Sequence, residues 1–212
     1  MFAERMGRIS ASPTLKVLLE AEKLRRQGVD VVDFGAGEPD FPTPDHAKTA
    51  ATTAIEENFT KYTASAGTSE LKQAIAARYE SDYGIAVGES EVIATAGGKQ
   101  ALYNVAMVLY EKGDEVITHA PCWPTLTEQV KVADATPIIV HSRPEDGFVL
   151  HPGEIIDAIT PRTKAIIINS PCNPTGAVTS ERQLAEITDA AARRGIWLVL
   201  DLCYEKLIYD DV

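Results

Sequence analysis

The stretch KAIIINSPCNPTGAVT, residues 164–179, decides the fold. Its first six residues form an apolar run rich in β-branched isoleucine, which predicts a buried strand, and the Pro- and Gly-containing loop that follows ends the strand. Ser180 and Gln183 match a capping box that opens a helix, Gly195 ends that helix, and residues 196–200 form a second apolar run. A strand, a helix and a strand joined by short loops predict a parallel pair with a crossover helix.

The same alternation extends toward the amino terminus and places the chain in the α/β class, with a parallel sheet covered on both faces. Residues 35–45, GAGEPDFPTPD, contain too many glycines and prolines for a regular element and predict a rigid loop. Further strands are predicted at residues 92–96, 115–119 and 136–141, and further helices at 14–27, 44–57, 70–82, 99–110, 125–133 and 152–159.

Composition excludes several classes of function. The 212 residues are 45% hydrophobic and 24% charged, as in ordinary globular proteins, and the net charge of -11 argues against binding to nucleic acid or an anionic membrane surface. No apolar run is long enough to span a bilayer, and the charged start MFAERMGRIS is no export signal, so we expect a cytoplasmic protein. The three cysteines lack any paired spacing, which predicts reduced thiols and no metal site.

Chemically capable residues follow the predicted strands, and ligands of parallel α/β sheets bind at the carboxyl ends of strands. A glycine turn at residues 96–100, AGGKQ, leads into a helix, and Trp123, Asn173, Asp201 and Tyr204 follow later strands. Each has a purely structural alternative: tight packing for the glycines, core burial for Trp123, and turn or cap formation for the others. Together they predict a pocket for a planar, phosphorylated heteroaromatic ring.

Pyridoxal phosphate has these requirements. Its phosphate needs backbone amides, its ring a stacking face, its phenolate oxygen hydrogen-bond donors and its pyridine nitrogen a carboxylate. The glycine turn is not a Walker loop, because Ile93 stands where the first glycine belongs and Gln100 where Ser or Thr belongs. The pattern at Gly35 and Gly37 is no dinucleotide fingerprint, because Asp40 replaces its third glycine.

Five segments occur in the order and spacing of a known family, with NPTG and the later D-x-x-Y as the most specific motifs. By these segments the chain resembles, over essentially its whole length, the fold-type I class I/II aminotransferases, and within them the aspartate aminotransferase-like subgroup. The resemblance implies the large domain of a PLP-dependent transferase with a mostly parallel sheet. The segments are LRRQGVDVVDFGAGEPDFPTP (24–44), TKYTASAG (60–67), TAGGKQALYN (95–104), NSPCNPTGAV (169–178) and LVLDLCYEKLIY (198–209).

The resemblance also implies a division of the chain and a role for each motif. Residues 1–45 would contribute to the small domain and an active-site loop, and residues 46–212 would form an incomplete PLP-binding large domain. The implied cofactor contacts are Gly98, Lys99 and Gln100 to the phosphate, Trp123 stacked on the ring, Asn173 and Tyr204 to the phenolate oxygen, and Asp201 to the pyridine nitrogen.

Substrate and partner contacts are implied in the same way. Gly37 would offer its backbone to the substrate α-carboxylate, with Trp123 and Asn173 nearby. Tyr62 would reach the phosphate of the neighbouring subunit, because active sites of the family lie at a homodimer interface. Pro121 and Pro174 match positions that have cis peptide bonds in relatives.

Three features depart from the family pattern. Leu202 and Cys203 replace an acid and an aliphatic residue, and Ser10 stands where relatives that accept bulky dicarboxylates carry a lysine. The Schiff-base lysine of the family is expected after Val212, and the arginine for the α-carboxylate later still. Lys99 lies at the phosphate end and Lys206 only two residues after Tyr204, so neither is assigned this role. The 212-residue chain therefore contains no assigned catalytic residue and is expected to be inactive alone.

The function implied is amino-group transfer from an amino acid to a 2-oxo acid through pyridoxal phosphate. One alternative keeps the fold and cofactor but catalyses a lyase or decarboxylase reaction. Another is a non-catalytic aminotransferase-like domain, such as part of a transcriptional regulator. No basic helix-turn-helix segment precedes residue 14, which disfavours the regulator.

Overall fold

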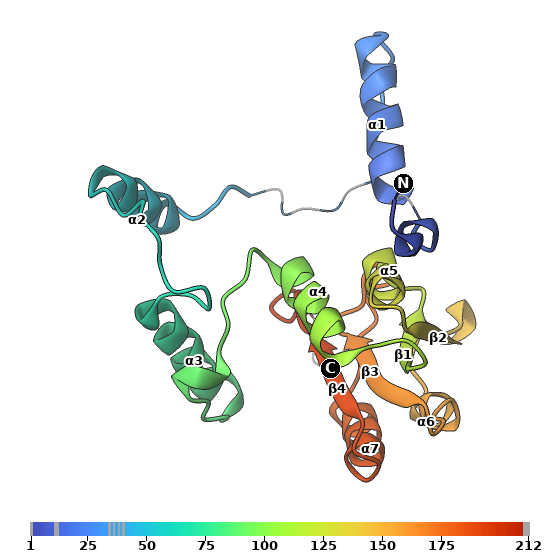
Figure 1. Ribbon diagram of the computed structural model, residues 1–212. Coiled ribbons are helices and arrows are strands. Elements are labelled where there is room, and N and C mark those ends of the chain that lie inside the picture. Colours follow the sequence, from blue (N-terminus) through green and yellow to red (C-terminus); the bar gives the residue numbers. More distant parts are fainter. Residues whose placement is uncertain are drawn as a thin grey trace. The chain divides into compact units, whose positions relative to one another are not determined.

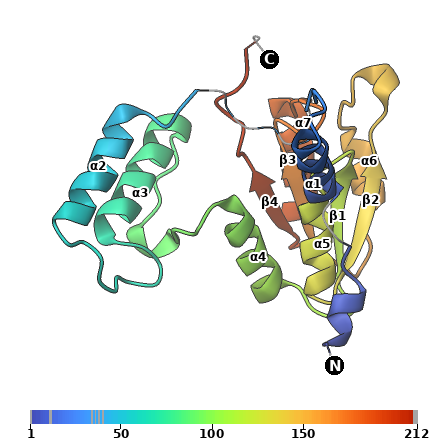
Figure 2. The same cartoon turned by 90° about the horizontal axis from the view of Figure 1, so that it is seen from above.

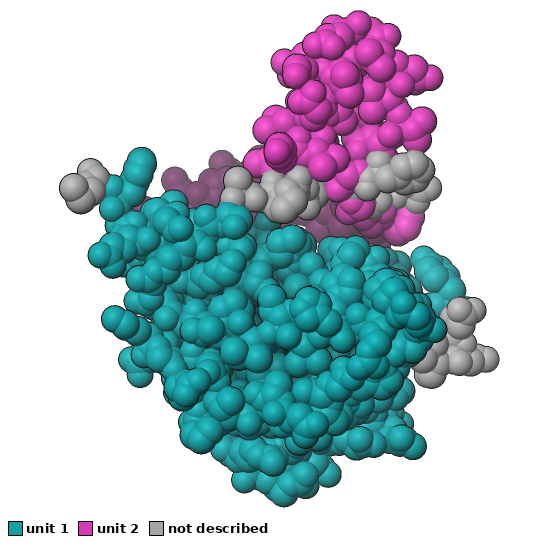
Figure 3. All heavy atoms as spheres, turned by 90° about the vertical axis from the view of Figure 1, so that its right-hand side faces the viewer, with its two compact units in different colours: residues 1–12, 97–212 teal, residues 13–96 magenta. Residues whose placement is uncertain are grey.

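The computed structural model describes residues 2–10, 13–33, 35, 37, 39 and 41–209, and the chain divides into two compact units. One unit comprises Met1–Ser12 and Gly97–Val212, and the other comprises Pro13–Ala96; Figure 3 colours them separately. The expected boundary between a small-domain segment at 1–45 and a large-domain segment at 46–212 stays a prediction.

The larger unit contains a parallel sheet that, within the described residues, has four strands in the order β2-β1-β3-β4 (Figures 1 and 2). Each pair of neighbours runs in the same direction, and in the central pair Ile166 of β3 lies beside Ile117 of β1. The strands are β1 (Glu115–Ala120), β2 (Thr136–His141), β3 (Thr163–Asn169) and β4 (Trp197–Asp201). The helices of this unit are α4 (Gly98–Leu109), α5 (Pro124–Val132), α6 (Pro152–Asp157) and α7 (Glu181–Ala192), with short 3-10 turns η1 (Glu4–Gly7) and η3 (Pro144–Asp146).

Helices cover both faces of this sheet, as Figure 1 shows. Successive side chains of a strand point to opposite faces, so an apolar strand needs burial on both sides. Ala165 and Ile167 of β3 pack with α4 and α5, whereas Ile166 and Ile168 pack with α6 and α7. All four side chains are at most 3% exposed. This two-sided burial confirms the predicted α/β architecture and explains why β3 is a continuous apolar run.

The capping box predicted before α7 is present. Ser180 accepts a hydrogen bond from the backbone N–H of Gln183, and the Gln183 side chain accepts one from the backbone N–H of Ser180. Such a cap stabilises a helix by about 1 kcal/mol. It holds α7 at the point where the chain leaves the loop after β3.

The smaller unit contains α1 (Pro13–Arg26), α2 (Asp45–Glu56), α3 (Ser69–Tyr83) and the 3-10 turn η2 (Glu89–Glu91). The three helices confirm those predicted from the sequence, although α2 begins one residue later, with Pro44 as its N-cap. Thr68 caps α3 by accepting a hydrogen bond from the N–H of Leu71, and Lys72 of α3 pairs with Glu89 of η2 at 3.3 Å. Most of the predicted loop at residues 35–45 also lacks regular structure where it is described.

The predicted strand at residues 92–96 is wrong. Val92 has extended backbone angles, but the segment forms no ladder with the sheet. The N–H of Ala94 instead donates to the carbonyl of Ala66, in the loop before α3, at 2.9 Å. An apolar run predicts an extended conformation, but a strand also needs a neighbouring strand to pair with.

Other expectations concern peptide geometry and cysteines. The Ala120–Pro121 and Asn173–Pro174 bonds are cis, as the resemblance implied, and Ser170–Pro171 is cis as well. Cys122, Cys172 and Cys203 are free thiols. In the described part of the chain, no helix combines the length and apolar character that a bilayer span requires.

A buried histidine lies on the central strand β1. His119 is 5% exposed, and its Nε2 accepts a hydrogen bond from the backbone N–H of Asn169 on β3 at 3.2 Å. Acceptance requires a free lone pair on Nε2, so this bond selects the neutral ring with its proton on Nδ1. Burial lowers the pKa of His119 below its ordinary value of 6.5.

This lowered pKa predicts a loss of stability in mild acid. Below pH 6.5 the unfolded chain binds a proton at His119 that the folded chain does not bind, so the free energy of unfolding falls as the pH decreases through that value toward the folded-state pKa. His119→Gln keeps an acceptor but cannot titrate. Chemical denaturation between pH 7.5 and 5 should therefore show a shallower loss for His119→Gln than for wild type, with His46→Gln on exposed α2 as the matched variant. Equal slopes for wild type and His119→Gln would contradict it.

Candidate functional site

The candidate site lies at the carboxyl ends of β1, β3 and β4. Asn169 and Asp201 end their strands as register partners, so the two loops that follow start side by side. A pocket at this edge brings together six residues selected from the sequence and two that were not. The predicted six are Gly98, Lys99, Trp123, Asn173, Asp201 and Tyr204, and the others are Asn169 and Cys203.

Three predicted site residues fall outside this pocket lining. Gln100 lies in the first turn of α4, next to Lys99, and is exposed. Gly37 and Tyr62 belong to the other unit, where both are exposed. Tyr62 is fully exposed on the loop between α2 and α3. Their roles stay predictions.

The amino terminus of α4 forms one side of the pocket. Gly97 precedes the helix with φ of 80°, a conformation that favours glycine, and the helix begins at Gly98. The first turn of a helix carries the positive end of the helix dipole. In α4 the Gln100 N–H of this turn donates to the Gly97 carbonyl at 3.1 Å. A Cβ added at Gly97 or Gly98 would meet no atom within 4 Å, so the space there is open. The arrangement is suited to an anion such as phosphate.

Trp123 lies opposite this helix end, in the loop that links β1 to α5. Its ring packs partly against the core between the sheet and α4 and α5, and it also lines the pocket. The ammonium of Lys99 lies 5.0 Å from the centre of the ring, within the range of a cation–π contact. The Lys99 carbonyl accepts a hydrogen bond from Gln129 Nε2 of α5 at 2.8 Å, which ties the two helices together. The Trp123 indole therefore both packs against the core and lines the pocket.

The loops after β3 and β4 contribute polar groups. Asn173 Nδ2 donates to the Tyr204 hydroxyl at 3.3 Å, which joins an amide and a phenol at the pocket wall. Asp201 is half-buried, and its Oδ1 accepts from the N–H of Cys203 at 3.2 Å. These contacts place hydrogen-bond donors and a carboxylate along one wall.

The sequence reading missed Asn169, which is 2% exposed at the end of β3. Its position at the end of an apolar run, just before the Pro-containing loop, predicts the end of the strand and no contact in the site. A polar residue at the carboxyl end of a buried strand was the available signal, because buried amides need partners.

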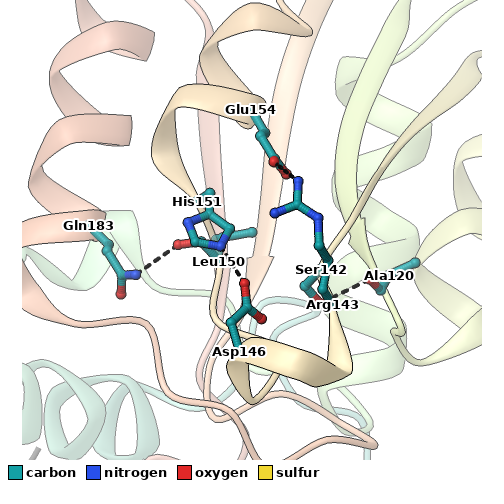
Figure 4. Close-up of polar contacts among 8 residues, drawn as sticks. All are labelled: Ala120, Ser142, Arg143, Asp146, Leu150, His151, Glu154 and Gln183. Atoms are coloured by element: carbon teal, nitrogen blue, oxygen red, sulfur yellow. Dashed lines mark hydrogen bonds and ion pairs between the residues drawn. The ribbon is translucent and has the colours of Figure 1, made fainter.

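The loop after β2 is fastened to the same sheet edge (Figure 4). The backbone N–H and the hydroxyl of Ser142 both donate to the Ala120 carbonyl, at 2.8 and 3.1 Å, three residues before Trp123. Asp146 binds His151 at 2.6 Å, and this hydrogen bond is the main reason why the pKa of Asp146 is lowered. Arg143 pairs with Glu154, and Gln183 donates to the Leu150 carbonyl at 2.8 Å.

The thiols near the pocket are poorly suited to nucleophilic chemistry. Burial, with a smaller contribution from Cys172, raises the pKa of Cys122 to about 11. Burial and then the neighbouring Asp201 raise the pKa of Cys203. Both thiols are therefore protonated near neutral pH, whereas a cysteine nucleophile needs a thiolate.

Comparison with known proteins identifies the family of the chain. The family model for aminotransferase class I and II matches residues 29–212. The probable aspartate/prephenate aminotransferase of Aquifex aeolicus is 43% identical over 209 residues, which are 99% of this chain and 53% of that protein.

Solved structures give the same result. Aspartate aminotransferase from Thermus thermophilus with maleate has a TM-score of 0.96 at 42% identity, covering 100% of this chain and 55% of that one. Alanine aminotransferase from Pyrococcus furiosus has a TM-score of 0.94 at 30% identity, covering 100% and 54%. The chain spans about half the length of the curated relatives it matches, and it belongs to the class I and II aminotransferases.

Proposed function

We propose that the full-length protein containing this chain transfers an amino group from an amino acid to a 2-oxo acid with pyridoxal phosphate as cofactor. The family and its fold depend on that cofactor. The observation that carries the proposal is the pocket at the strand ends, where a helix amino terminus, an indole, an amide, a phenol and a carboxylate meet. Each of these groups matches one part of the cofactor.

The phosphate side of the pocket fits the group. An added Cβ at Gly97 or Gly98 would meet no atom within 4 Å, so the space there is open, and the amino-terminal end of α4 carries the positive end of the helix dipole, which favours an anion. We assign Gly98, Lys99 and Gln100 to the phosphate. The Lys99 ammonium adds a positive charge within reach of the same helix end.

The ring side fits as well. Trp123 offers an indole face, and the Asn173–Tyr204 pair supplies an amide and a hydroxyl for the phenolate oxygen. Asp201 is the carboxylate of the pocket, and we assign it to the pyridine nitrogen. A carboxylate there favours the protonated form of its partner.

The bound cofactor would supply an electron sink for the substrate α-carbon. The chain's own residues would hold and polarise that group: Asp201 keeps a proton on the pyridine nitrogen, and Asn173 and Tyr204 stabilise negative charge on the phenolate oxygen. Trp123 would stack on the ring and exclude water from that side. Gly37 would offer backbone to the substrate α-carboxylate, with Trp123 and Asn173 nearby.

Aspartate is the amino donor we propose, because several relatives above 40% identity are aspartate or aspartate/prephenate aminotransferases. Ser10 stands where enzymes that accept bulky dicarboxylates carry a lysine, so prephenate is the less favoured substrate. In the structure the Ser10 N–H donates to Glu128 at 2.8 Å. Homodimer assembly and a cytoplasmic location belong to the same proposal.

The first test is amino transfer by the full-length protein. Aspartate and 2-oxoglutarate should yield glutamate, and Asp201→Asn should lose most of that activity because an amide has no charge with which to hold the pyridine proton. The fold should persist, since an Asn oxygen can still accept from the Cys203 N–H. Asp189→Asn, an exposed carboxylate on α7, is the matched control. Release of ammonia without glutamate would indicate a lyase, and normal turnover in Asp201→Asn would refute its assignment.

A second prediction concerns cofactor retention by Trp123. Stacking contributes roughly 0.5 to 1.5 kcal/mol beyond burial, so Trp123→Ala should weaken cofactor affinity by about 2- to 13-fold, and Trp123→Phe by less. Trp197→Ala, which removes an indole from the opposite end of β4, serves as the control. Equilibrium dialysis measures the dissociation constants. Unchanged affinity in Trp123→Ala would assign this indole to the core alone.

A third prediction is that Tyr62 acts across a subunit boundary. Subunits with Tyr62→Phe and subunits with Asp201→Asn should each be deficient as homodimers. In a mixed dimer, one site has both Asp201 and the partner-supplied Tyr62 intact, so activity should return toward half of wild type. Absence of recovery, with mixed dimers demonstrated by differential tagging, would mean that Tyr62 serves its own subunit or none.

A further inference from the structure

A buried carboxamide lies between the two loops that form the ring side of the pocket. Asn169 is the last residue of β3, is 2% exposed, and is paired in register with Asp201 of β4. Its side chain lines the pocket, yet none of the roles described above uses it.

Three polar groups of Asn169 each tie a different segment to the end of β3. The side-chain Oδ1 accepts from the backbone N–H of Asn173 at 2.7 Å. The side-chain Nδ2 donates to the backbone carbonyl of Asp201 at 3.2 Å, and that carbonyl also accepts from the Ser170 N–H. The backbone N–H of Asn169 donates to His119 Nε2 on β1 at 3.2 Å.

The partners determine the orientation of the carboxamide. A backbone N–H can only donate and a backbone carbonyl can only accept, so the oxygen of Asn169 must face Asn173 and its nitrogen must face Asp201. A side chain of this length with one donor and one acceptor is required. A carboxylate would lose the bond to Asp201, a leucine would lose both bonds, and a serine would be too short to span the two segments.

We propose that Asn169 is a positioning residue, which sets the backbones of Asn173 and Asp201 relative to each other and so holds their side chains in register with the cofactor ring. The inference rests on the proposed function, because it assigns Asn173 and Asp201 to that ring. The Asn173 side chain in turn donates to the Tyr204 hydroxyl, so one buried carboxamide orders the amide, the phenol and the carboxylate of the ring side.

The low exposure of Asn169 makes this coupling strong. A buried polar group that loses its partner pays the full cost of its desolvation. Movement of either the Asn173 N–H or the Asn169 side chain out of hydrogen-bond distance is therefore unfavourable, and the two groups stay in one geometry. The phosphate side is built differently, from the amino terminus of α4 and from Lys99. The hydrogen bonds of Asn169 described above go to His119, Asn173 and Asp201 and not to α4. Loss of the Asn169 carboxamide should therefore weaken ring binding and leave anion binding unchanged.

The test measures binding to the full-length protein rather than turnover. The probe 4′-deoxypyridoxine 5′-phosphate keeps the ring and phosphate but has no aldehyde to react with a lysine, and inorganic phosphate probes the anion side alone. Asn169→Asp should weaken binding of the ring probe by roughly tenfold, the equivalent of one lost buried hydrogen bond, without changing the inorganic phosphate constant. Asn169→Leu, which introduces no charge, should weaken ring binding at least as much.

The pH profile separates positioning from mere packing. A protonated carboxyl has one O–H donor and one acceptor, like the carboxamide, so affinity of Asn169→Asp relative to wild type should recover as the pH falls. Burial raises the pKa of a carboxyl, which moves this recovery toward neutral pH. His119, whose Nε2 accepts from the Asn169 N–H, is present in both proteins, so the comparison with wild type at each pH removes its contribution. Asn169→Leu should show no recovery, because it cannot gain a donor.

The matched control is Thr118→Val. Thr118 is also fully buried between β1 and β3, and its hydroxyl donates to the Ile167 carbonyl at 3.3 Å, but its hydrogen bond stays within the sheet. This variant should lose stability in thermal unfolding and keep its affinity for the ring probe. Circular dichroism at each pH verifies that every variant is folded.

Three results would overturn the proposal: wild-type affinity for the ring probe in both Asn169 variants, an equal loss for inorganic phosphate, or an equal loss in Thr118→Val. Failure of the wild-type protein to bind the ring probe would instead overturn the proposed function, and this inference with it. The two failures are therefore distinguishable.

Discussion

The ring side of the candidate site depends on the backbone ladder between β3 and β4. Parallel pairing in register brings Asn169 and Asp201 to the same level, and the Ser170 N–H extends the ladder by donating to the Asp201 carbonyl at 3.1 Å. Because parallel strands carry their loops on one edge, the segments after β1, β3 and β4 must meet there. The apolar residues on both faces of β3 are buried against helices, and this burial stabilises the ladder. The polar residue Asn169 at its end then contacts both loops of the ring side.

The pocket has two sides with different electrostatic character. The helix end at Gly98 and the Lys99 ammonium form a positive side in a chain of net charge -11, whereas Asp201 brings a carboxylate to the other side. A ligand that carries a negative phosphate and a protonated ring nitrogen at opposite ends satisfies both. Orientation of such a ligand follows from this separation of charge before any contact with the substrate is considered.

Local patterns were sufficient to predict most elements, because their determinants are local. The alternation of apolar runs and caps located β1 to β4, and the Ser180–Gln183 box marked the start of α7. The strand predicted at residues 92–96 failed since strand formation depends on a partner, and the Ala94 N–H finds one at the Ala66 carbonyl instead. Apolar sequence alone contains no information about which segment will pair with it.

The site residues divide in the same way. Five pocket residues were identified because they stand at the carboxyl end of a predicted strand or soon after it, where polar and aromatic residues are conspicuous: Gly98, Trp123, Asn173, Asp201 and Tyr204. Asn169 was not, because its partners lie 4, 32 and 50 residues away and only the folded chain brings them together. Gly37 and Tyr62 belong to the other compact unit, so their proposed roles depend on contacts that local pattern cannot predict.

The backbone arrangement at the carboxyl edge of the sheet does not determine which amino acid an enzyme of this family accepts. The Thermus thermophilus aspartate aminotransferase and the Pyrococcus furiosus alanine aminotransferase match this chain with TM-scores of 0.96 and 0.94, although their names specify a dicarboxylic and a monocarboxylic amino acid. A backbone that is common to both cannot distinguish a second carboxylate. Discrimination of that group requires a charged or hydrogen-bonding side chain placed against it, since a buried carboxylate without a partner is costly. Under the proposed function, the strand ends would hold the cofactor ring, and side chains outside this shared framework would decide which amino acid is bound.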